Sequence, residues 1–556
     1  MRSVELTAAV LTLVSVASGQ TGSPKKLEGR ATESAFLYRR RALHAIAVLN
    51  DRLYVEGGET SPYNETDNTL LNEPTAPLNK TLWLPLDTSW TNATVNFTEI
   101  EQDEPLPINN LRLWADADSK TLYRWGGDGP AGTSDVAEDI ALWSMTVDSD
   151  GSGAWSQKTA ANDGFFADLY SAASGGGAVC GGMGFYLGGY GSSATDTRLS
   201  DTAFPDRMPV PGLLTYNMTA RTWANESTVP LNSPDGTWTS GEALCVPGFG
   251  DNSLVFVIGG TTTPVTTAAR ADSHFGDFSN ITFYDPVEQQ WHWQEAGGDV
   301  PRGRAQLCAV GVQGENTYDI YVYGGVDSSD NALSDVSVLS IPGFQWFSLD
   351  VTSSARMRHT CALVGQSQML VLGGIETEWV WDNPDPWTQA LGVFDLKKWQ
   401  WSDKYDAEAD EYDSPDTVLD WYKEGGYGAI DWSSDAVESL FGTATIWPTS
   451  NSTSSSSASV SASDSSSSSS SSSTPVGAIA GGVIGGVAVL ALVGVGYFFW
   501  RRKQRTRKPD PHELEPISPK QELQSQSVSP AVKMEEVTPV KPVELPGHFK
   551  AAELPG

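Results

Sequence analysis

Cysteine, histidine and positive charge are all scarce in this chain. Its 556 residues include 4 cysteines, too few for a small domain held together mainly by disulfides. Lysine and arginine number 35 against 69 aspartates and glutamates, so the formal net charge is −34 at pH 7. This negative charge argues against binding to nucleic acid as a main function. The 54 glycines, 20 tryptophans and 39% hydrophobic residues are instead typical of a large globular domain that is not rich in helices.

Charge is also missing from two apolar segments, which predict the topology of the chain. Residues 1–19 pass from a charged start through an apolar stretch to small residues, the pattern of a secretory signal peptide. Residues 476–500 hold no charge and exceed the ~20 helical residues that cross a bilayer. Aromatic residues end this run, and a basic cluster follows from Arg501 as at the cytosolic end of a membrane-spanning helix. We therefore expect a single-pass type I protein of the plasma membrane, with residues 20–449 outside the cell and the C-terminus in the cytosol.

Sequons for N-glycosylation agree with this orientation, because the modification takes place in the secretory lumen. All eight Asn-x-Ser/Thr sequons precede the predicted membrane helix. Their asparagines are Asn64, Asn79, Asn92, Asn96, Asn217, Asn225, Asn280 and Asn451. The sequence thus predicts a glycoprotein.

Low-complexity segments flank the predicted membrane helix. Residues 450–475 are mostly serine and predict a flexible or O-glycosylated stalk. Residues 501–556 are rich in proline and mixed charge, which predicts a disordered cytoplasmic tail with proline-rich motifs for cytosolic partners. Gly477, Gly481 and Gly485 recur at a spacing of four in the membrane helix, a pattern that can support a homodimer.

A repeated unit organises the region before the stalk. In each unit a short β-branched or aromatic run ends in two glycines, and a tryptophan follows further along the chain. The diglycines are Gly57-Gly58, Gly126-Gly127, Gly188-Gly189, Gly259-Gly260, Gly324-Gly325 and Gly373-Gly374. The tryptophans are Trp90, Trp155, Trp223, Trp291, Trp346 and Trp399. Short runs ended by a breaker indicate strands, and paired glycines permit sharp turns and close approach of two backbones.

The six units resemble the kelch repeat, over roughly Arg41 to Trp399. This resemblance implies an all-β fold, a six-bladed β-propeller of four-stranded blades. The order of propeller, serine-rich stalk and glycine-rich helix is similar to that of fungal membrane-anchored kelch surface proteins, which are related to the central domain of galactose oxidase. A seventh blade at Gly425-Gly426 is less favoured, because the acidic segment before it lacks two strands. A closing segment is expected there instead, and residues 34–40 are expected to lend a strand to the last blade.

All four cysteines fall on the first strands of consecutive units: Cys180, Cys245, Cys308 and Cys361. In an oxidising lumen an even set predicts disulfides, with three connectivities. First strands converge at the centre of a propeller, which favours Cys180 with Cys245 and Cys308 with Cys361. Buried free thiols are the alternative.

Enzymes resembling galactose oxidase hold copper with two histidines and two tyrosines, one of them cross-linked to a cysteine. Before the membrane helix this chain has only His44, His274, His292 and His359, and none adjoins a tyrosine. We therefore predict no catalytic residue, no metal and no cofactor. The alternative is a membrane-tethered carbohydrate-active enzyme, either an oxidase or a glycoside hydrolase, with carboxylates from residues 196–206 or 327–335.

Basic side chains recur where the units begin, and they are the candidate binding residues. They are Arg41, His44, Arg302, Arg304, Arg356, Arg358 and His359. In an acidic domain these groups are expected to gather at one mouth of the propeller channel and to hold an anionic or sugar ligand. Equally, they can tie strands together. The function predicted is non-catalytic binding of an extracellular protein or cell-wall glycan, with a cytosolic tail for scaffolding or signalling.

Overall fold

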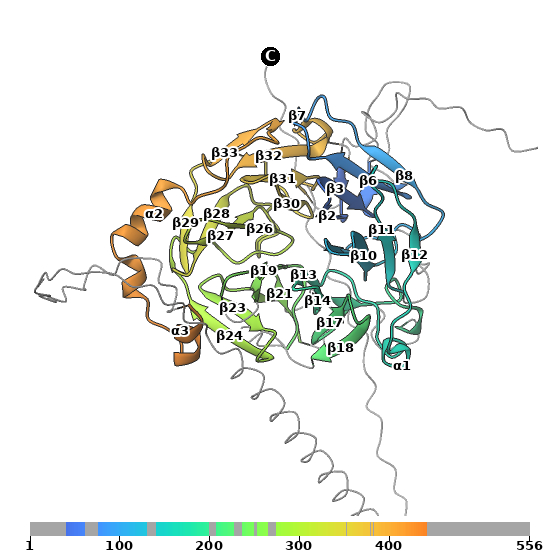
Figure 1. The fold of residues 1–556 in the computed structure, drawn as a ribbon, viewed down its shortest axis with the longest axis horizontal. Helices are drawn as coiled ribbons and strands as arrows, with labels where there is room; N and C mark the ends of the chain where they lie inside the picture. Colours follow the sequence, from blue (N-terminus) through green and yellow to red (C-terminus); the bar gives the residue numbers. More distant parts are fainter. Residues whose placement is uncertain are drawn as a thin grey trace, which may run out of the picture. The chain divides into compact units, whose positions relative to one another are not determined.

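The computed structural model describes residues 40–61, 76–130, 141–199, 207–226, 236–249, 253–264, 274–351, 353–377, 380–381 and 383–441. These residues form a six-bladed β-propeller (Figure 1), which confirms the predicted fold. The predicted signal peptide (1–19), stalk (450–475), membrane helix (476–500) and tail (501–556) lie outside the described residues. Among the described helices, none is both long enough and apolar enough to cross a bilayer.

Each blade is a four-stranded antiparallel sheet whose strands follow one another along the chain. Blade 1 contains β2 (Ala45–Leu49), β3 (Arg52–Glu56), β6 (Lys80–Pro85) and β8 (Thr98–Glu101). Blade 2 contains β9 (Arg112–Asp116), β10 (Thr121–Trp125), β11 (Trp143–Thr146) and β12 (Trp155–Gln157). Blade 3 contains β13 (Gly176–Cys180), β14 (Met183–Leu187), β17 (Leu213–Asn217) and β18 (Thr222–Glu226).

The second half of the propeller repeats this order. Blade 4 contains β19 (Glu242–Val246), β20 (Leu254–Ile258), β23 (Asn280–Asp285) and β24 (Gln290–Glu295). Blade 5 contains β26 (Cys308–Gln313), β27 (Tyr318–Tyr323), β28 (Val336–Ile341) and β29 (Gln345–Ser348), with β25 (Gly297–Gly298) parallel to β29. Blade 6 contains β30 (Thr360–Val364), β31 (Gln368–Leu372), β32 (Leu391–Asp395) and β33 (Gln400–Ser402). The first strands of neighbouring blades contact one another in a closed circle from β2 to β30.

Short elements connect or decorate the blades. Strands β1 (Arg41–Ala42), β4 (Glu59–Thr60) and β5 (Ala76–Pro77) form one small sheet, and β15 (Tyr190–Gly191) pairs with β16 (Met208–Pro209). Strand β21 (Thr261–Thr262) pairs with β22 (His274–Phe275), and β7 (Trp90–Thr91) with β34 (Lys404–Tyr405). The helices are α1 (Asp163–Phe166), α2 (Asp416–Lys423) and α3 (Asp435–Phe441), with 3-10 turns η1 (Thr197–Leu199), η2 (Thr388–Ala390) and η3 (Gly426–Ala429).

The diglycines fix each blade against the next. All twelve of these glycines have φ between 59° and 109°, a range that L side chains rarely adopt. In every pair the second glycine donates its N–H to a carbonyl of the following blade, at 2.6–2.9 Å. Gly188 shows why the first position is glycine, because a Cβ there would lie closer than 3.0 Å to the carbonyl oxygen of Trp238. The repeated motif therefore sets the spacing between blades.

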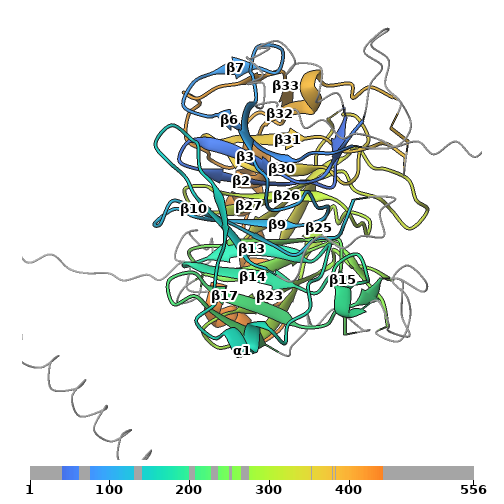
Figure 2. The ribbon, with the colours of Figure 1, turned by 90° about the vertical axis from the view of Figure 1, so that its right-hand side faces the viewer.

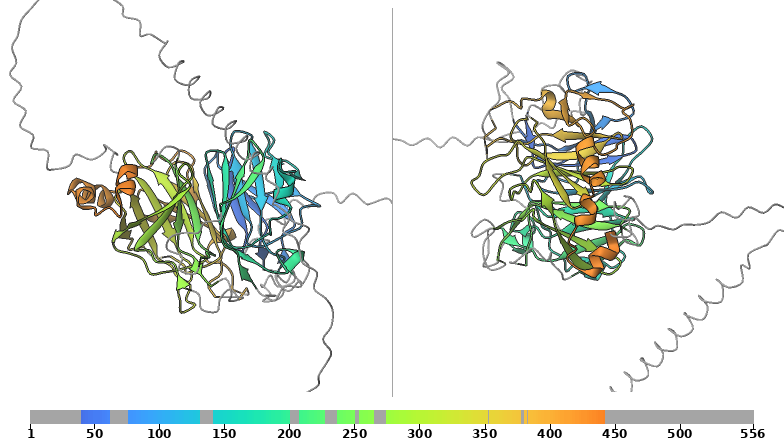
Figure 3. Two further views of the ribbon diagram at one scale, coloured as in Figure 1. Left: turned by 90° about the horizontal axis from the view of Figure 1, so that it is seen from below. Right: turned by 90° about the vertical axis from the view of Figure 1, so that its left-hand side faces the viewer.

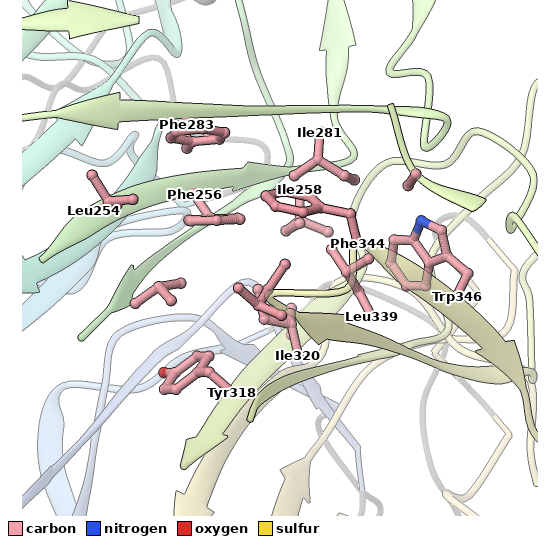
Figure 4. Close-up of a cluster of buried hydrophobic side chains, with 14 of the residues drawn as sticks. Leu254, Phe256, Ile258, Ile281, Phe283, Tyr318, Ile320, Leu339, Phe344 and Trp346 are labelled. Carbon is pink, nitrogen blue, oxygen red and sulfur yellow. The ribbon is translucent and has the colours of Figure 1, made fainter. Parts of the chain in front are cut away.

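Apolar side chains fill the space between adjacent blades. Between blades 4 and 5, Phe256 and Phe283 face Ile320 and Leu339, and all four are fully buried (Figure 4). Trp346 belongs to the same cluster and donates its indole N–H to the carbonyl of Phe278 in blade 4 at 2.9 Å. Tryptophans near the outer strands thus join neighbouring sheets, as the repeat predicts.

Two disulfides join the innermost strands, in the pairing that the sequence favoured. Cys180 in blade 3 is bonded to Cys245 in blade 4, with their Cα atoms 5.5 Å apart. Cys308 in blade 5 is bonded to Cys361 in blade 6, with their Cα atoms 5.7 Å apart. The prediction of disulfide bonds is confirmed.

The expected strand from residues 34–40 stays a prediction, because only Arg40 of this segment belongs to the described residues. Blade 6 contains four strands of its own. Blade 1 meets blade 6 through the pairing of β7 with β34 and a hydrogen bond from the N–H of Gly374 to the carbonyl of Arg41. The guanidinium of Arg40 adds a hydrogen bond to the carbonyl of Asn383 at 2.6 Å.

Residues 406–441, which we call the C-terminal strap, run along the outside of the propeller rather than forming a seventh blade (Figures 1 and 3). Gly425 lies in the turn between α2 and η3, and Gly426 is the first residue of η3. The hydroxyl of Tyr412 donates to the buried carboxylate of Asp319 in blade 5 at 2.6 Å. At the end of α3, Phe441 is buried among the aromatic rings between blades 4 and 5.

Candidate functional site

Six residues, one from each blade, form a closed ring of backbone hydrogen bonds at the centre of the propeller. They are Leu43, Asn110, Ser174, Ser240, Gln306 and Arg358, and we call them the channel ring. Each lies just before the first strand of its blade and has a left-handed φ of 54–67°. Each donates its N–H to the carbonyl of the ring residue in the preceding blade, at 2.6–3.3 Å, and Leu43 closes the circle by donating to Arg358. None is a glycine, so all six side chains are available to line a site.

A cavity of about 550 Å³ lies at this ring, and all six ring residues line it. Its remaining wall includes Tyr190, Arg207, Phe275 and Asp330, from the loops of blades 3 to 5. The hairpin of β15 and β16, which carries Tyr190, projects from one face of the propeller (Figure 2). The cavity therefore joins the channel to loops on that face and is lined by apolar, polar and charged side chains.

A buried carboxylate orients two side chains of the cavity wall. Asp128 accepts a hydrogen bond from the amide of Asn110 and another from the hydroxyl of Tyr190, both at 2.8 Å. Burial raises the pKa of Asp128, although these hydrogen bonds and the cations Arg207 and Arg358 act in the opposite direction. The guanidinium of Arg207 lies 5.0 Å from the centre of the Tyr190 ring, within range of a cation–π interaction. This part of the wall is held in place before any ligand arrives.

An ion pair spans the channel wall from blade 2 to blade 4. The guanidinium of Arg112 donates to both carboxylate oxygens of Glu242, at 2.9 and 3.2 Å, and to the carbonyls of Gly175 and Gly241. Burial raises the pKa of Glu242, and the charge of Arg112 opposes that shift. Arg112 can cross blade 3 because Gly177 stands there, where a Cβ would lie 2.9 Å from Cγ of Arg112.

The two histidines of the cavity are buried and neutral. Burial lowers the pKa of His359 from 6.5 to about 3, helped by the charge of Arg356. Burial and the nearby Arg41 hold the pKa of His44 well below its usual range. His44 shares a hydrogen bond with the hydroxyl of Thr360 at 2.8 Å, which links blade 1 to blade 6. These imidazoles hydrogen-bond to the protein and do not present positive charge to a ligand.

The seven predicted binding residues separate into two groups. His44, Arg358 and His359 line the cavity. Arg41, Arg304 and Arg356 are at most 2% exposed, so their prediction as ligand-binding residues at the channel mouth needs correcting. Arg304 donates to Asp335, whose side chain is partly exposed, and Arg356 donates to the buried Asp385, both in charge-assisted pairs.

Arg302 is the exception, because its side chain is 67% exposed and pairs with Asp327 outside the cavity. Arg304 and Arg356 also donate to the carbonyls of Gly324 and Gly373, which follow the second strands of their blades, so these two arginines tie strand ends within the protein.

Sequence reasoning missed most of the cavity. Asn110, Ser174, Ser240 and Gln306 share a repeat position with Arg358 but lack its charge. Aligning the six units column by column would have placed them together. Arg207 lies outside this repeat position, just before β16 in the segment between the second and third strands of blade 3.

The described residues contain no group of three or more histidine, cysteine, aspartate or glutamate side chains arranged to hold a metal ion. In the described part of the two loops considered for an enzyme, three aspartates form ion pairs with arginines: Asp196 with Arg198, Asp327 with Arg302 and Asp335 with Arg304. Asp330 lines the cavity. The side chains that line the cavity can bind a ligand through hydrogen bonds and charge.

Six blades of this topology with a diglycine after each second strand define a kelch-type β-propeller. Residues 249–411 match the family model of the KLHDC2/KLHL20/DRC7 Kelch-repeats domain, over blades 4 to 6. This match and the six blades together support a kelch β-propeller, a fold that suggests a protein-binding scaffold. No curated protein shows a significant match to it.

Proposed function

We propose that the chain is a non-catalytic, single-pass type I surface protein whose propeller binds a segment of a partner protein in the channel cavity. Its stalk separates the propeller from the membrane, and its cytosolic tail serves scaffolding or signalling. The observation that carries the proposal is the channel ring, which presents one side chain from every blade on a fixed backbone.

The lining suits a mixed polar and apolar peptide segment. Arg207 and Arg358 supply cations, Asp330 supplies an anion, and Leu43 and Phe275 supply apolar contact. Because Asp128 already orients Asn110 and Tyr190, a ligand does not have to immobilise those side chains, which favours affinity.

A catalytic function finds less support in the cavity. Glycoside hydrolysis needs two carboxyl groups that act on one bond. The carboxylates among the described lining residues are Glu242, which is paired with Arg112, and Asp330.

A peptide-display library panned against the secreted ectodomain, residues 21–449, tests the binding site. We expect enriched peptides to bind about 10-fold or more weakly to Arg358→Ala and to Arg207→Ala, because hydrogen bonds to a charged group contribute roughly 1.5–3 kcal/mol. Arg302→Ala is the matched control, since this arginine is exposed outside the cavity. Equal losses in all three variants would refute the site.

A glycan array and metal analysis on the same sample distinguish the other ligand classes. Saturable glycan binding that is lost in Arg358→Ala would replace the protein partner by a glycan at the same cavity. Stoichiometric copper, or turnover of a bound sugar, would refute the non-catalytic function. Tags on both termini, probed on intact cells, test the type I orientation separately.

A further inference from the structure

The asparagines of the predicted N-glycosylation sequons differ in how exposed they are in the folded propeller. Asn79, Asn96 and Asn225 are exposed on blades 1 and 3. Asn217 and Asn280 are half-buried, and Asn64 and Asn451 lie outside the described residues. Asn92 is only 6% exposed.

Asn92 lies in the contact that closes the propeller between blades 1 and 6. Its side-chain amide donates to the carbonyl of Leu391 in blade 6 at 2.9 Å. Its backbone N–H donates to the carbonyl of Asp403 at 2.8 Å, and its own carbonyl accepts from the side chain of Gln389 at 2.7 Å. Asn92 directly follows β7, whose pairing with β34 is part of the same contact.

We propose that the folded protein carries N-linked glycans on Asn79, Asn96 and Asn225 and an unmodified amide at Asn92. In the transfer, the amide nitrogen bonds to the anomeric carbon of an oligosaccharide carried on a polyprenyl diphosphate. The bond from that carbon to the diphosphate oxygen breaks, the lipid diphosphate leaves with the electron pair, and the amide loses one proton. A sugar on the exposed asparagines extends into solvent.

A sugar on Asn92 has no such space. It would occupy the contact between blades 1 and 6, so a chain modified there cannot close the ring. The sequon at Asn92 is therefore skipped in every molecule that folds. This inference rests on the proposed surface location, because the modification requires passage through the secretory lumen.

The test is glycopeptide mapping of the full chain, made in eukaryotic cells and recovered from the cell surface. Treatment with a peptide amidase that removes N-glycans converts each glycosylated asparagine to aspartate, which mass spectrometry locates. We expect conversion at Asn79, Asn96 and Asn225 and none at Asn92. Conversion at Asn92, or its absence from any of the three exposed positions when other sequons are converted, would overturn the inference while the surface location stands.

Absence of conversion at every sequon would overturn both the inference and the proposed location.

Two variants distinguish the effect of losing the sequon from the effect of losing the Asn92 amide. Thr94→Ala destroys the sequon but keeps Asn92, and the exposed Thr94 hydrogen-bonds only locally to Thr91. We expect it to leave surface yield and the remaining glycopeptides unchanged.

Asn92→Ala also destroys the sequon but removes the hydrogen bond to Leu391. We expect it to lower surface yield several-fold. Equal yields for the two variants would show that Asn92 does not serve ring closure, and would overturn the reason given for its protection.

Discussion

Replacing Arg124 by methionine should destabilise the propeller by about 3–5 kcal/mol, because it leaves a buried carboxylate without its cation. Arg124 in β10 of blade 2 donates to Glu56 in β3 of blade 1 at 2.7 Å. The side chains are 3% and 0% exposed, respectively. Glu56 also accepts from the hydroxyl of Thr81 at 2.6 Å and the amide of Gln102 at 3.3 Å. These neutral donors remain in the variant, but they do not neutralise the charge.

Lys80→Met is the matched control, since it removes a cation from β6 of blade 1, next to Thr81, which hydrogen-bonds to Glu56. Lys80 pairs with Glu99 and Glu101, and its side chain is 31% exposed. Partly exposed pairs of this kind contribute about 0–1 kcal/mol. The double variant Glu56→Met with Arg124→Met should recover much of the lost stability, because it removes both buried charges.

Urea unfolding of the ectodomain, followed by tryptophan fluorescence, measures how much each of the three variants changes the free energy of unfolding. If Arg124→Met costs no more than Lys80→Met, the buried pair does not join blades 1 and 2 as argued. If the double variant is as unstable as Arg124→Met, the loss comes from packing rather than from the unpaired charge.

Three further predictions concern the channel and its strands. Gly177→Ala should displace Arg112 and weaken peptide binding in a calorimetric titration about 10-fold, whereas Gly164→Ala, with nothing within 4 Å, should not. Replacing both cysteines of the blade 5 to blade 6 disulfide, which are 53 residues apart, should cost about 4 kcal/mol in urea unfolding; a cost near zero would contradict this. Because the pKa of His359 is about 3 in the fold against 6.5 ordinarily, the neutral form stabilises the fold fully above pH 6.5. Stability should fall as the pH drops from 6.5 towards 3, by up to about 1.4 kcal/mol per unit, and His359→Gln should flatten this slope.

The repeat was predictable because each of its features has a local cause. A left-handed backbone beside a neighbouring carbonyl admits little but glycine, so Gly188 and its equivalents recur in every unit. First strands must converge in any propeller, which made Cys180–Cys245 and Cys308–Cys361 the natural disulfides. Such constraints are visible in the residue types themselves.

The cavity was not predictable in the same way, because chemically similar side chains serve different purposes there. Arg356 and Arg358 are two positions apart, yet Arg356 is buried against Asp385 while Arg358 lines the cavity. Arg358 itself has the left-handed backbone of the channel ring, and no residue type marks that conformation among the six units. Arg112 in blade 2 reaches Glu242 in blade 4 because Gly177 in blade 3 leaves room, a relation between blades that a single unit does not contain.

At the channel ring, backbone atoms stabilise the propeller, while the side chains are left to determine which ligand binds. A left-handed conformation costs a non-glycine residue roughly 1–2 kcal/mol, and a backbone hydrogen bond returns about 1 kcal/mol. The ring hydrogen bonds join backbone atoms alone, so they are the same for Leu43 as for Arg358. The side chains are then free to vary without changing the scaffold, and the ring holds five residue types on one backbone conformation. Glycine would relieve the strain at every one of these positions, yet all six carry a side chain that lines the cavity, and Asn110 and Arg358 use theirs to hydrogen-bond to Asp128 and Gln306.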